Sequence, residues 1–227
     1  MLLSEITIQL SAWKASPGAL RLPFSNASGE QLGHLICVGK DDWLDEELAQ
    51  KIAEWRERDK LAFATRFIPD VAKTKGYLQH VAFAGKDRIL FRLTDMDDML
   101  VGHIGLANIN NSTADLDNLM LGNRDKGLEF IHAAEIELLH FCFDVLGVER
   151  VAADVLSTNL GAQLLHRSIG FKATVKTPLD SKIDGSGTEV LSPAQDVAAP
   201  TSDINNIRFE LEMLKFHKRF PPNPANR

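Results

Sequence analysis

The sequence is poor in cysteine, in tyrosine and in runs of charge of one sign. Its two cysteines, Cys37 and Cys142, lie within apolar patterns, where a free thiol behaves as a small hydrophobic side chain, so we expect both to be buried thiols. The formal charge of −6 and the lack of any Lys/Arg run argue against a dedicated nucleic-acid binder, which needs a basic surface. The sequence shows neither a basic leader nor an uncharged apolar run of membrane-spanning length, so we expect a cytoplasmic protein without a membrane partner.

Short apolar strands and amphipathic helices make up most of the chain. Two helical patterns, Asp41 to Lys60 and Pro69 to Gly85, precede three strands that are joined by tight turns and end at Leu121. A strand, helix, strand, helix and strand follow in that order, and residues 207–214 alternate as a last strand. This order predicts an α/β fold with a mixed, mostly antiparallel central sheet of six to seven strands and helices on both faces.

Three segments differ from this pattern in composition. Residues 1–34 alternate weakly at Ile6, Ile8 and Leu10, and we interpret them as an N-terminal strand or arm in front of a main domain of residues 35–214. Within that domain, residues 177–206 are rich in Ser, Gly, Pro and Asp with little periodicity, which predicts a long flexible loop. Residues 215–227 are expected to form a tail.

Two stretches carry the functional information. The first, Arg124-Asp125-Lys126-Gly127, lies where a strand gives way to a helix. A helix start presents unpaired backbone N–H groups and the positive end of the helix dipole, which suits a phosphate or pyrophosphate, although a plain helix start gives the same pattern. The second stretch begins at Asn159, which we interpret as a helix N-cap, and ends at Gly170 and Phe171, where the helix gives way to a strand.

At this spacing the two stretches resemble the GNAT superfamily of acetyl-CoA-dependent N-acyltransferases, in particular the branch with ribosomal-protein N-terminal and amino-sugar acetyltransferases. The resemblance covers residues 35–171 and implies a GNAT-like fold with residues 207–214 as its last strand. Arg124 and Gly127 match the Arg and the second Gly of the family's pyrophosphate loop. The family pattern of the last helix and strand is matched by Asn159, Ala162, Leu165, Gly170 and Phe171.

The resemblance implies acetyl-CoA as a cosubstrate and no metal. It assigns the thioester oxygen to a backbone N–H near Leu119 to Leu121. Asp125 and Glu129 stand where the family loop has its first Gly and its final small residue, so backbone donors bind the pyrophosphate only if both carboxylates turn outward. Asn159 is either a structural cap alone or a cap that also contacts the pantetheine arm. The implied cofactor-binding residues are Leu119, Leu121, Arg124, Asp125, Lys126, Gly127, Leu128 and Asn159.

Two side chains are candidates for proton transfer. His166 occupies the position where the family often has a Tyr that protonates the leaving thiolate, and imidazole titrates near neutral pH; alternatively it is a partly exposed helix residue. A primary amine is mostly protonated at pH 7, so acyl transfer to it also needs a base. Asp117, which shares a strand face with Asp115, is the first candidate base, and the alternative is that both carboxylates are only solvated.

We therefore expect direct transfer, in a ternary complex, from acetyl-CoA to the primary amine of a small molecule. Arg56, Arg58 and Arg66 lie beside aromatic residues and suit an anionic acceptor, although a charged helix face gives the same pattern. The Trp55-Arg56 pair and the Asp117-Asn118 pair also resemble those of acetyltransferases in nucleotide-sugar pathways, and this resemblance implies a nucleotide-linked amino sugar as the acceptor. Two alternatives stay open: an acetyltransferase of protein N-termini, and a catalytically degenerate CoA-binding regulatory module. The strand at residues 207–214 could also pair between subunits in a homodimer.

Overall fold

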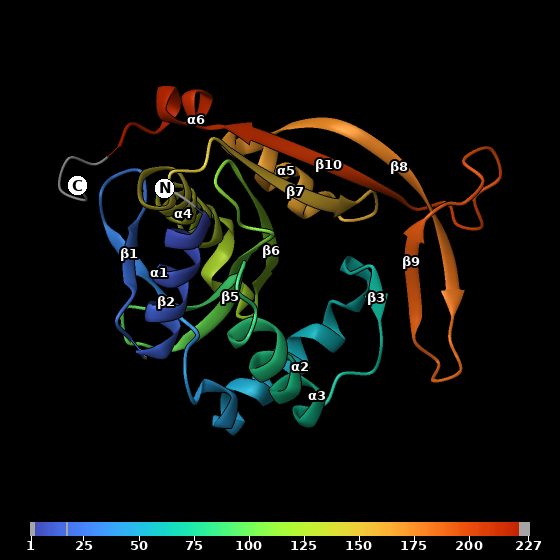
Figure 1. Ribbon diagram of the computed structural model, residues 1–227, viewed down its shortest axis with the longest axis horizontal. Coiled ribbons are helices and arrows are strands. Elements are labelled where there is room, and N and C mark those ends of the chain that lie inside the picture. The colour runs from blue at the N-terminus through green and yellow to red at the C-terminus, as the bar shows by residue number, and fades with distance from the viewer. Residues whose placement is uncertain (1–2, 17, 223–227) are drawn as a thin grey trace.

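The computed structural model of the chain describes residues 3–16 and 18–222, and one sheet of ten strands runs through it (Figure 1). The strand order is β1-β2-β4-β5-β6-β7-β10-β8-β9-β3, and neighbouring strands are antiparallel except for β6 and β7. The predicted α/β class and mostly antiparallel sheet are confirmed. The predicted number of six to seven strands is wrong, because the sheet continues at both edges through strands that the sequence did not indicate. The strands are β1 (Arg21–Ser25), β2 (Gln31–Cys37), β3 (Thr65–Arg66), β4 (Ile89–Asp95), β5 (Leu100–Ala107), β6 (Thr113–Leu121), β7 (Arg150–Leu156), β8 (Lys172–Ile183), β9 (Glu189–Pro193) and β10 (Asn205–Glu212).

Helices cover both faces of the sheet, as predicted. The larger core lies under α1 and α4, where Phe24 of β1 packs edge-on against Phe130 of α4 with ring centroids 4.9 Å apart. The smaller core lies under α2 and α3, where Ile52 and Leu78 meet Leu90 of β4. The helices are α1 (Leu3–Ala15), α2 (Glu46–Arg58), α3 (Val71–Tyr77), α4 (Gly127–His140), α5 (Leu160–Ile169) and α6 (Met213–Arg219); α3 and α4 continue into π-helical segments at Leu78–Phe83 and Phe141–Leu146.

The expected N-terminal strand is a helix. Ile6 and Leu10 lie one helical turn apart and are buried against the sheet, whereas Ile8, between them, is 70% exposed. The apparent alternation of apolar residues was therefore the buried face of α1 with one exposed isoleucine beside it. After this helix, β1 and β2 pair with each other and β2 pairs with β4, so the first part of the chain belongs to the main sheet.

The expected flexible loop at residues 177–206 is also wrong. The second half of β8 turns back into β9 and forms a long hairpin that projects from the body of the molecule (Figure 1). Asp180 accepts hydrogen bonds from the backbone N–H groups of Gln195 and Thr201, which orders the chain that returns to β10. The segment buries only a few apolar side chains, chiefly Leu179 and Leu191, and this explains its weak periodicity.

The far end of the chain is helical where a tail was expected. Met213–Arg219 forms α6, and Phe216 inserts into the main core. The rest of the expected tail, residues 223–227, lies outside the described residues. Cys37 and Cys142 are buried free thiols, as predicted. Within residues 3–16 and 18–222, none of the helices has both the length and the apolar character that crossing a bilayer requires.

Candidate active site

The site lies where β6 and β7 separate. These strands pair in parallel only from Thr113 to Leu116 on β6, against residues 150–153 of β7. Beyond that point β6 pairs with β5 alone, and its register shifts between Met120 and Asp117 because two residues of β6 oppose one residue of β5. Asn118, one of these two, has a φ of 52°, so β6 carries a β-bulge where the two strands diverge. The separation leaves room for side chains of both strands to face a common space.

That space is a cavity of about 430 Å³, here called the inner cavity. Strands β6 and β7 and the start of α5 form one side of it, and α2, α3 and the connecting segment around β3 form the other. A volume of this size fits a small ligand. Its lining includes Arg56, Phe63, Phe67, Tyr77, His103, Leu116, Asp117, Asn118, Leu119, Asp154, Asn159 and His166.

The wall around β3 is tied to the projecting hairpin. Thr65 and Arg66 pair with Val190 and Glu189 of β9, and the guanidinium of Arg66 lies 2.9 Å from the Glu189 carboxylate. The N–H of Leu191 also donates to the carbonyl oxygen of Ala64 at 2.8 Å. The hairpin thus holds the segment between α2 and α3 over the inner cavity.

Asp117 lines the inner cavity just before the bulge. Its Oδ2 lies 3.6 Å from Nη1 of Arg88, and its side chain is 37% exposed, so the carboxylate is both paired and reachable by solvent. Asp115, two residues earlier, instead accepts hydrogen bonds from Arg208 and Asn108. The two carboxylates therefore differ: Asp117 faces the cavity, and Asp115 is bound to its neighbours.

His103 on β5 is buried directly beneath the bulge. Its Nδ1 lies 2.6 Å from the carbonyl oxygen of Asn118, an acceptor, so Nδ1 carries the proton. Burial lowers the pKa of His103 to about 4, and the ring is neutral at pH 7. Its Nε2 is buried without a hydrogen-bond partner among the residues described here. The amide of Asn118 donates to the Tyr77 hydroxyl at 2.8 Å, so the bulge is held by bonds to β5 and to α3.

His166 on α5 also lines the inner cavity, and it is a buried residue, not a partly exposed one on the helix surface. Its side chain is 3% exposed, and its Nδ1 lies 2.7 Å from Oε1 of Glu135, which is fully buried on α4. A carboxylate oxygen can accept a hydrogen bond from Nδ1 only when Nδ1 carries a proton. Nε2 is then the ring nitrogen that can exchange a proton with a ligand in the cavity.

Of the three arginines singled out in the sequence, only Arg56 lines the inner cavity. It lies over the Phe63 ring at 3.7 Å and donates to the Thr65 carbonyl at 3.2 Å, and it forms no salt bridge within the described part of the chain. Arg66 is paired with Glu189. Arg58 pairs with Asp59 and donates to the carbonyl oxygens at the end of β6, so it joins α2 to that strand.

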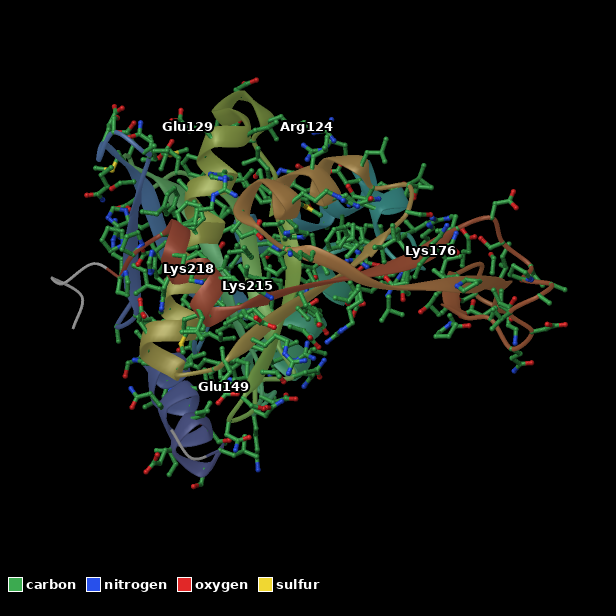
Figure 2. The ribbon with its side chains drawn as sticks, turned by 90° about the horizontal axis from the view of Figure 1, so that it is seen from above. Arg124, Glu129, Glu149, Lys176, Lys215 and Lys218 are labelled. Atoms are coloured by element: carbon green, nitrogen blue, oxygen red, sulfur yellow. The ribbon has the colours of Figure 1, made fainter. Side chains whose placement is uncertain are left out.

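A second depression, here called the outer groove, runs from the inner cavity to the start of α4 and has a volume of about 670 Å³. At its far end Gly127 has a φ of 75°, which favours glycine, and the space where a Cβ would lie is empty. Arg124 and Glu129 lie at this same end of α4 (Figure 2). The outer groove is lined by Arg58, Asp59, Leu61, Ala62, Phe63, Leu119, Met120, Leu121, Arg124, Gly127, Leu128, Ile131, Thr158, Asn159, Gly161, Ala162 and Leu165.

The structure brings together most, but not all, of the expected cofactor-binding residues. Leu119, Leu121, Arg124, Gly127, Leu128 and Asn159 line the outer groove. Asp125 and Lys126 are absent from its lining, and the ammonium of Lys126 lies 2.7 Å from the Asp95 carboxylate. Arg124 lines the groove while paired with Asp59. Asn159 accepts a hydrogen bond from the N–H of Ala162 at 3.2 Å, the geometry of an N-cap, and it lines both spaces.

Sequence reasoning missed Glu135, His103 and Tyr77. Glu135 had a usable signal, since it is a carboxylate on the buried face of a helix that otherwise reads as apolar, and such a group needs a partner. His103 lies in an apolar strand between Gly102 and Gly105, which was a weaker signal. Nothing in the sequence linked Tyr77 with Asn118.

The family model described as Acetyltransferase (GNAT) domain matches residues 42–172, more than half of the chain. None of the curated proteins gives a significant match. Many solved structures share the fold.

Three of these structures illustrate the likeness. A probable GNAT-family acetyltransferase from Chromobacterium violaceum is 13% identical with a TM-score of 0.64, over 89% of this chain and 90% of that one. FdhC, described as a nucleotide-linked sugar GNAT, is 16% identical with a TM-score of 0.60, over 88% and 94%. A spermidine N-acetyltransferase SpeG chimera from Vibrio cholerae and hSSAT is 14% identical with a TM-score of 0.56, over 77% and 96%. At these identities the likeness is one of fold, and the family match together with it shows that the chain is a GNAT-family N-acetyltransferase.

Proposed function

We propose that this chain transfers the acetyl group of acetyl-CoA to the primary amine of a small anionic acceptor, of which a nucleotide-linked amino sugar is the leading candidate. The observation that carries the proposal is that the outer groove and the inner cavity meet. Phe63, Leu119 and Asn159 line both of them. A donor in the groove and an acceptor in the cavity would therefore meet at the β6 bulge, which is the proximity that direct transfer requires.

The outer groove fits the donor. Its walls beside β6 and α5 are largely apolar, which suits a pantetheine arm, and its far end reaches the first N–H groups of α4, which suit a pyrophosphate. The two acidic residues of the loop, Asp125 and Glu129, are both outside the groove lining, which is consistent with a pyrophosphate bound by the backbone N–H groups. When bound, acetyl-CoA supplies an acetyl group activated as a thioester.

Three groups of the chain would divide the chemistry. Asp117, at the cavity wall, would take the proton from the acceptor ammonium. A backbone N–H released by the bulge near Leu119 would bind the thioester oxygen, because a β-bulge leaves an unpaired residue in the strand. His166, oriented by Glu135, would take up at Nε2 the second proton that the attacking nitrogen loses and pass it to the departing sulfur, which leaves as the CoA thiol. Sequence position and cavity lining support these roles.

Arg56 and its aromatic neighbours support an anionic acceptor. A guanidinium that forms no salt bridge within residues 3–16 and 18–222, placed over Phe63 in a cavity, is suited to a phosphate, and the Phe63 and Phe67 rings offer faces for a base or a sugar. The likeness to FdhC is consistent with this acceptor class. The β3–β9 pairing closes one wall of the cavity, which favours a small molecule over a protein N-terminus.

The first experiment is a thermal melt of the full chain with and without acetyl-CoA. At a hundredfold excess over its dissociation constant, a ligand that binds only the folded state adds about 2.7 kcal/mol, so the melting midpoint should rise by several degrees. An unchanged midpoint at saturating acetyl-CoA would favour the degenerate, non-catalytic alternative. Release of free CoA thiol should then be assayed with a nucleotide-linked amino sugar, the free amino sugar, a polyamine and a peptide N-terminus.

Arg56→Gln separates the acceptor class from the reaction itself. The variant should raise KM for the nucleotide-linked acceptor by about tenfold or more, since a hydrogen bond to a charged group contributes about 1.5–3 kcal/mol. The acetyl-CoA-dependent shift of the melt should stay unchanged, because Arg56 does not line the outer groove. An equal KM in the variant would contradict the anionic acceptor while leaving the acetyltransferase reaction intact.

A further inference from the structure

A cluster of metal-binding side chains lies where α6 meets the end of α4. His140 is the last residue of α4, Asp144 lies one turn further along the π-helical segment, and His217 comes from α6. None of the three lines the inner cavity or the outer groove. The acetyltransferase chemistry makes no use of them.

The geometry places one carboxylate oxygen at each imidazole. Nδ1 of His140 lies 3.0 Å from Oδ2 of Asp144, and Nε2 of His217 lies 3.0 Å from Oδ1 of the same carboxylate. All three ligand atoms lie within 4.8 Å of one another. Tetrahedral Zn²⁺ with bonds of about 2.0–2.2 Å to nitrogen and oxygen keeps its ligand atoms roughly 3.3–3.5 Å apart. The two 3.0 Å separations are shorter than this spacing and the 4.8 Å limit is longer, so the side chains would rotate when an ion binds.

The bonding in the cluster is incomplete as it stands. Although Nε2 of His217 is 3.0 Å from Asp144, it is buried and forms no hydrogen bond within the described part of the chain. The approach is therefore close in distance but poorly aligned for an N–H···O bond. A nitrogen lone pair without a partner is what a metal ion requires of a histidine.

The surroundings hold the two imidazoles in place and favour positive charge. Phe216, fully buried, contacts the His140 ring with centroids 4.9 Å apart and the His217 ring with centroids 5.7 Å apart. Burial and, next, the charge of Asp144 raise the pKa of Glu137 to about 7, so a second carboxyl group senses the negative potential of the first. A dication would offset that negative potential.

We propose that His140, Asp144 and His217 form a binding site for one transition-metal dication of the Zn²⁺ type, with water as the fourth ligand. Two imidazoles and one carboxylate suit Zn²⁺ and its neighbours, whereas Mg²⁺ and Ca²⁺ prefer oxygen ligands throughout. The three side chains are 16%, 25% and 21% exposed, so the cluster lies close to the protein surface. The bound ion would fasten α6 to α4, and the proposal is independent of the proposed acetyl transfer.

The test uses the full chain without a histidine tag, cleared of metal with a chelator and titrated with ZnCl₂ in a calorimeter. We expect one Zn²⁺ per chain and a melting midpoint that rises with Zn²⁺ but not with Mg²⁺. Asp144→Asn keeps the shape of the side chain and removes the charged ligand, and it should weaken Zn²⁺ binding by at least about tenfold. His80→Gln, at an exposed histidine outside the cluster, is the control and should bind like the parent.

His217→Gln provides a second arm from the other helix. It should also weaken Zn²⁺ binding by at least about tenfold, and a melt without metal shows whether α6 packing itself has changed. No Zn²⁺ binding by the parent chain would overturn the proposal. So would Zn²⁺ binding that both Asp144→Asn and His217→Gln leave unchanged, because the ion would then bind elsewhere.

Discussion

Glu135 and His166 form a buried pair that joins α4 to α5 at the wall of the inner cavity. The Oε1···Nδ1 distance is 2.7 Å, Glu135 is fully buried, and its Oε2 has no hydrogen-bond partner among the residues that the structure describes. Burying a carboxylate destabilises the folded protein unless a hydrogen-bonded or charged partner compensates for the lost hydration. The pair fixes which ring nitrogen carries the proton and which way the imidazole faces.

If His166 is the general acid, His166→Phe should lower kcat by about a hundredfold, the size of a typical general-acid contribution, and leave acetyl-CoA affinity nearly unchanged. Glu135→Leu should lower kcat too, and each single variant should destabilise the fold by about 3–5 kcal/mol, because each strands one partner of a buried pair. The double variant Glu135→Leu/His166→Phe should recover part of that stability without recovering turnover. Melts and single-turnover rates of the three variants test this, and a double variant as active as the parent would reject the role of His166.

Asp117 as the base makes a prediction about pH. Asp117→Asn should lose most activity at low pH, where the acceptor amine is fully protonated, and less as the pH approaches the amine's own pKa. Asp115→Asn is the matched control on the same strand, since Asp115 is bound to Arg208 and lies outside the cavity lining. The control should show a pH-independent change. Equal losses for Asp117→Asn at every pH would instead indicate a structural part.

Local pattern predicted the parts of the site that are local in sequence. The cap at Asn159 depends on a neighbour three residues away, and the turn at Gly127 depends on its own backbone conformation. Both could be placed on helix ends from the order of residue types alone. Most of the central strands could also be predicted from local sequence, because each contains a continuous run of apolar residues.

Pairings between distant residues could not be predicted in this way. Glu135 meets His166 across 31 residues, and Arg66 meets Glu189 across 123. The hairpin that carries Glu189 buries few apolar side chains, so its hydrogen bonds, and not its hydrophobic period, make it a strand. Helix α1 was misread for a related reason, since an exposed Ile8 completed a false alternation.

The neutral state of His103 links the site to stability in acid. Burial lowers its pKa from 6.5 to about 4, so between these values the unfolded chain takes up a proton that the folded chain does not. His103 therefore lowers the free energy of unfolding as the pH falls from about 6.5 to 4, and the decrease reaches about 3 kcal/mol at the lower end. His103→Asn can still donate to the Asn118 carbonyl but does not titrate, so its denaturant midpoint should fall less steeply over this range. A parallel pH dependence in parent and variant would contradict this account.

The last prediction concerns the ion pair that ties β3 to β9. Arg66 is largely shielded from solvent, and its partner Glu189 accepts a second hydrogen bond from the Ser181 hydroxyl at 2.6 Å. Arg66→Met should therefore loosen the segment between α2 and α3, raising the acceptor KM several-fold and weakening acetyl-CoA binding less, because only Leu61, Ala62 and Phe63 of that segment line the outer groove. Lys60→Met, which removes the more exposed pair with Glu57 nearby, is the control and should change neither, because exposed pairs contribute about 0–1 kcal/mol. Acceptor KM and acetyl-CoA melts for the two variants test the idea: a rise in KM shared by both would point to the charge of the surface, whereas a rise confined to Arg66→Met would mean that the hairpin shapes the acceptor side of the site.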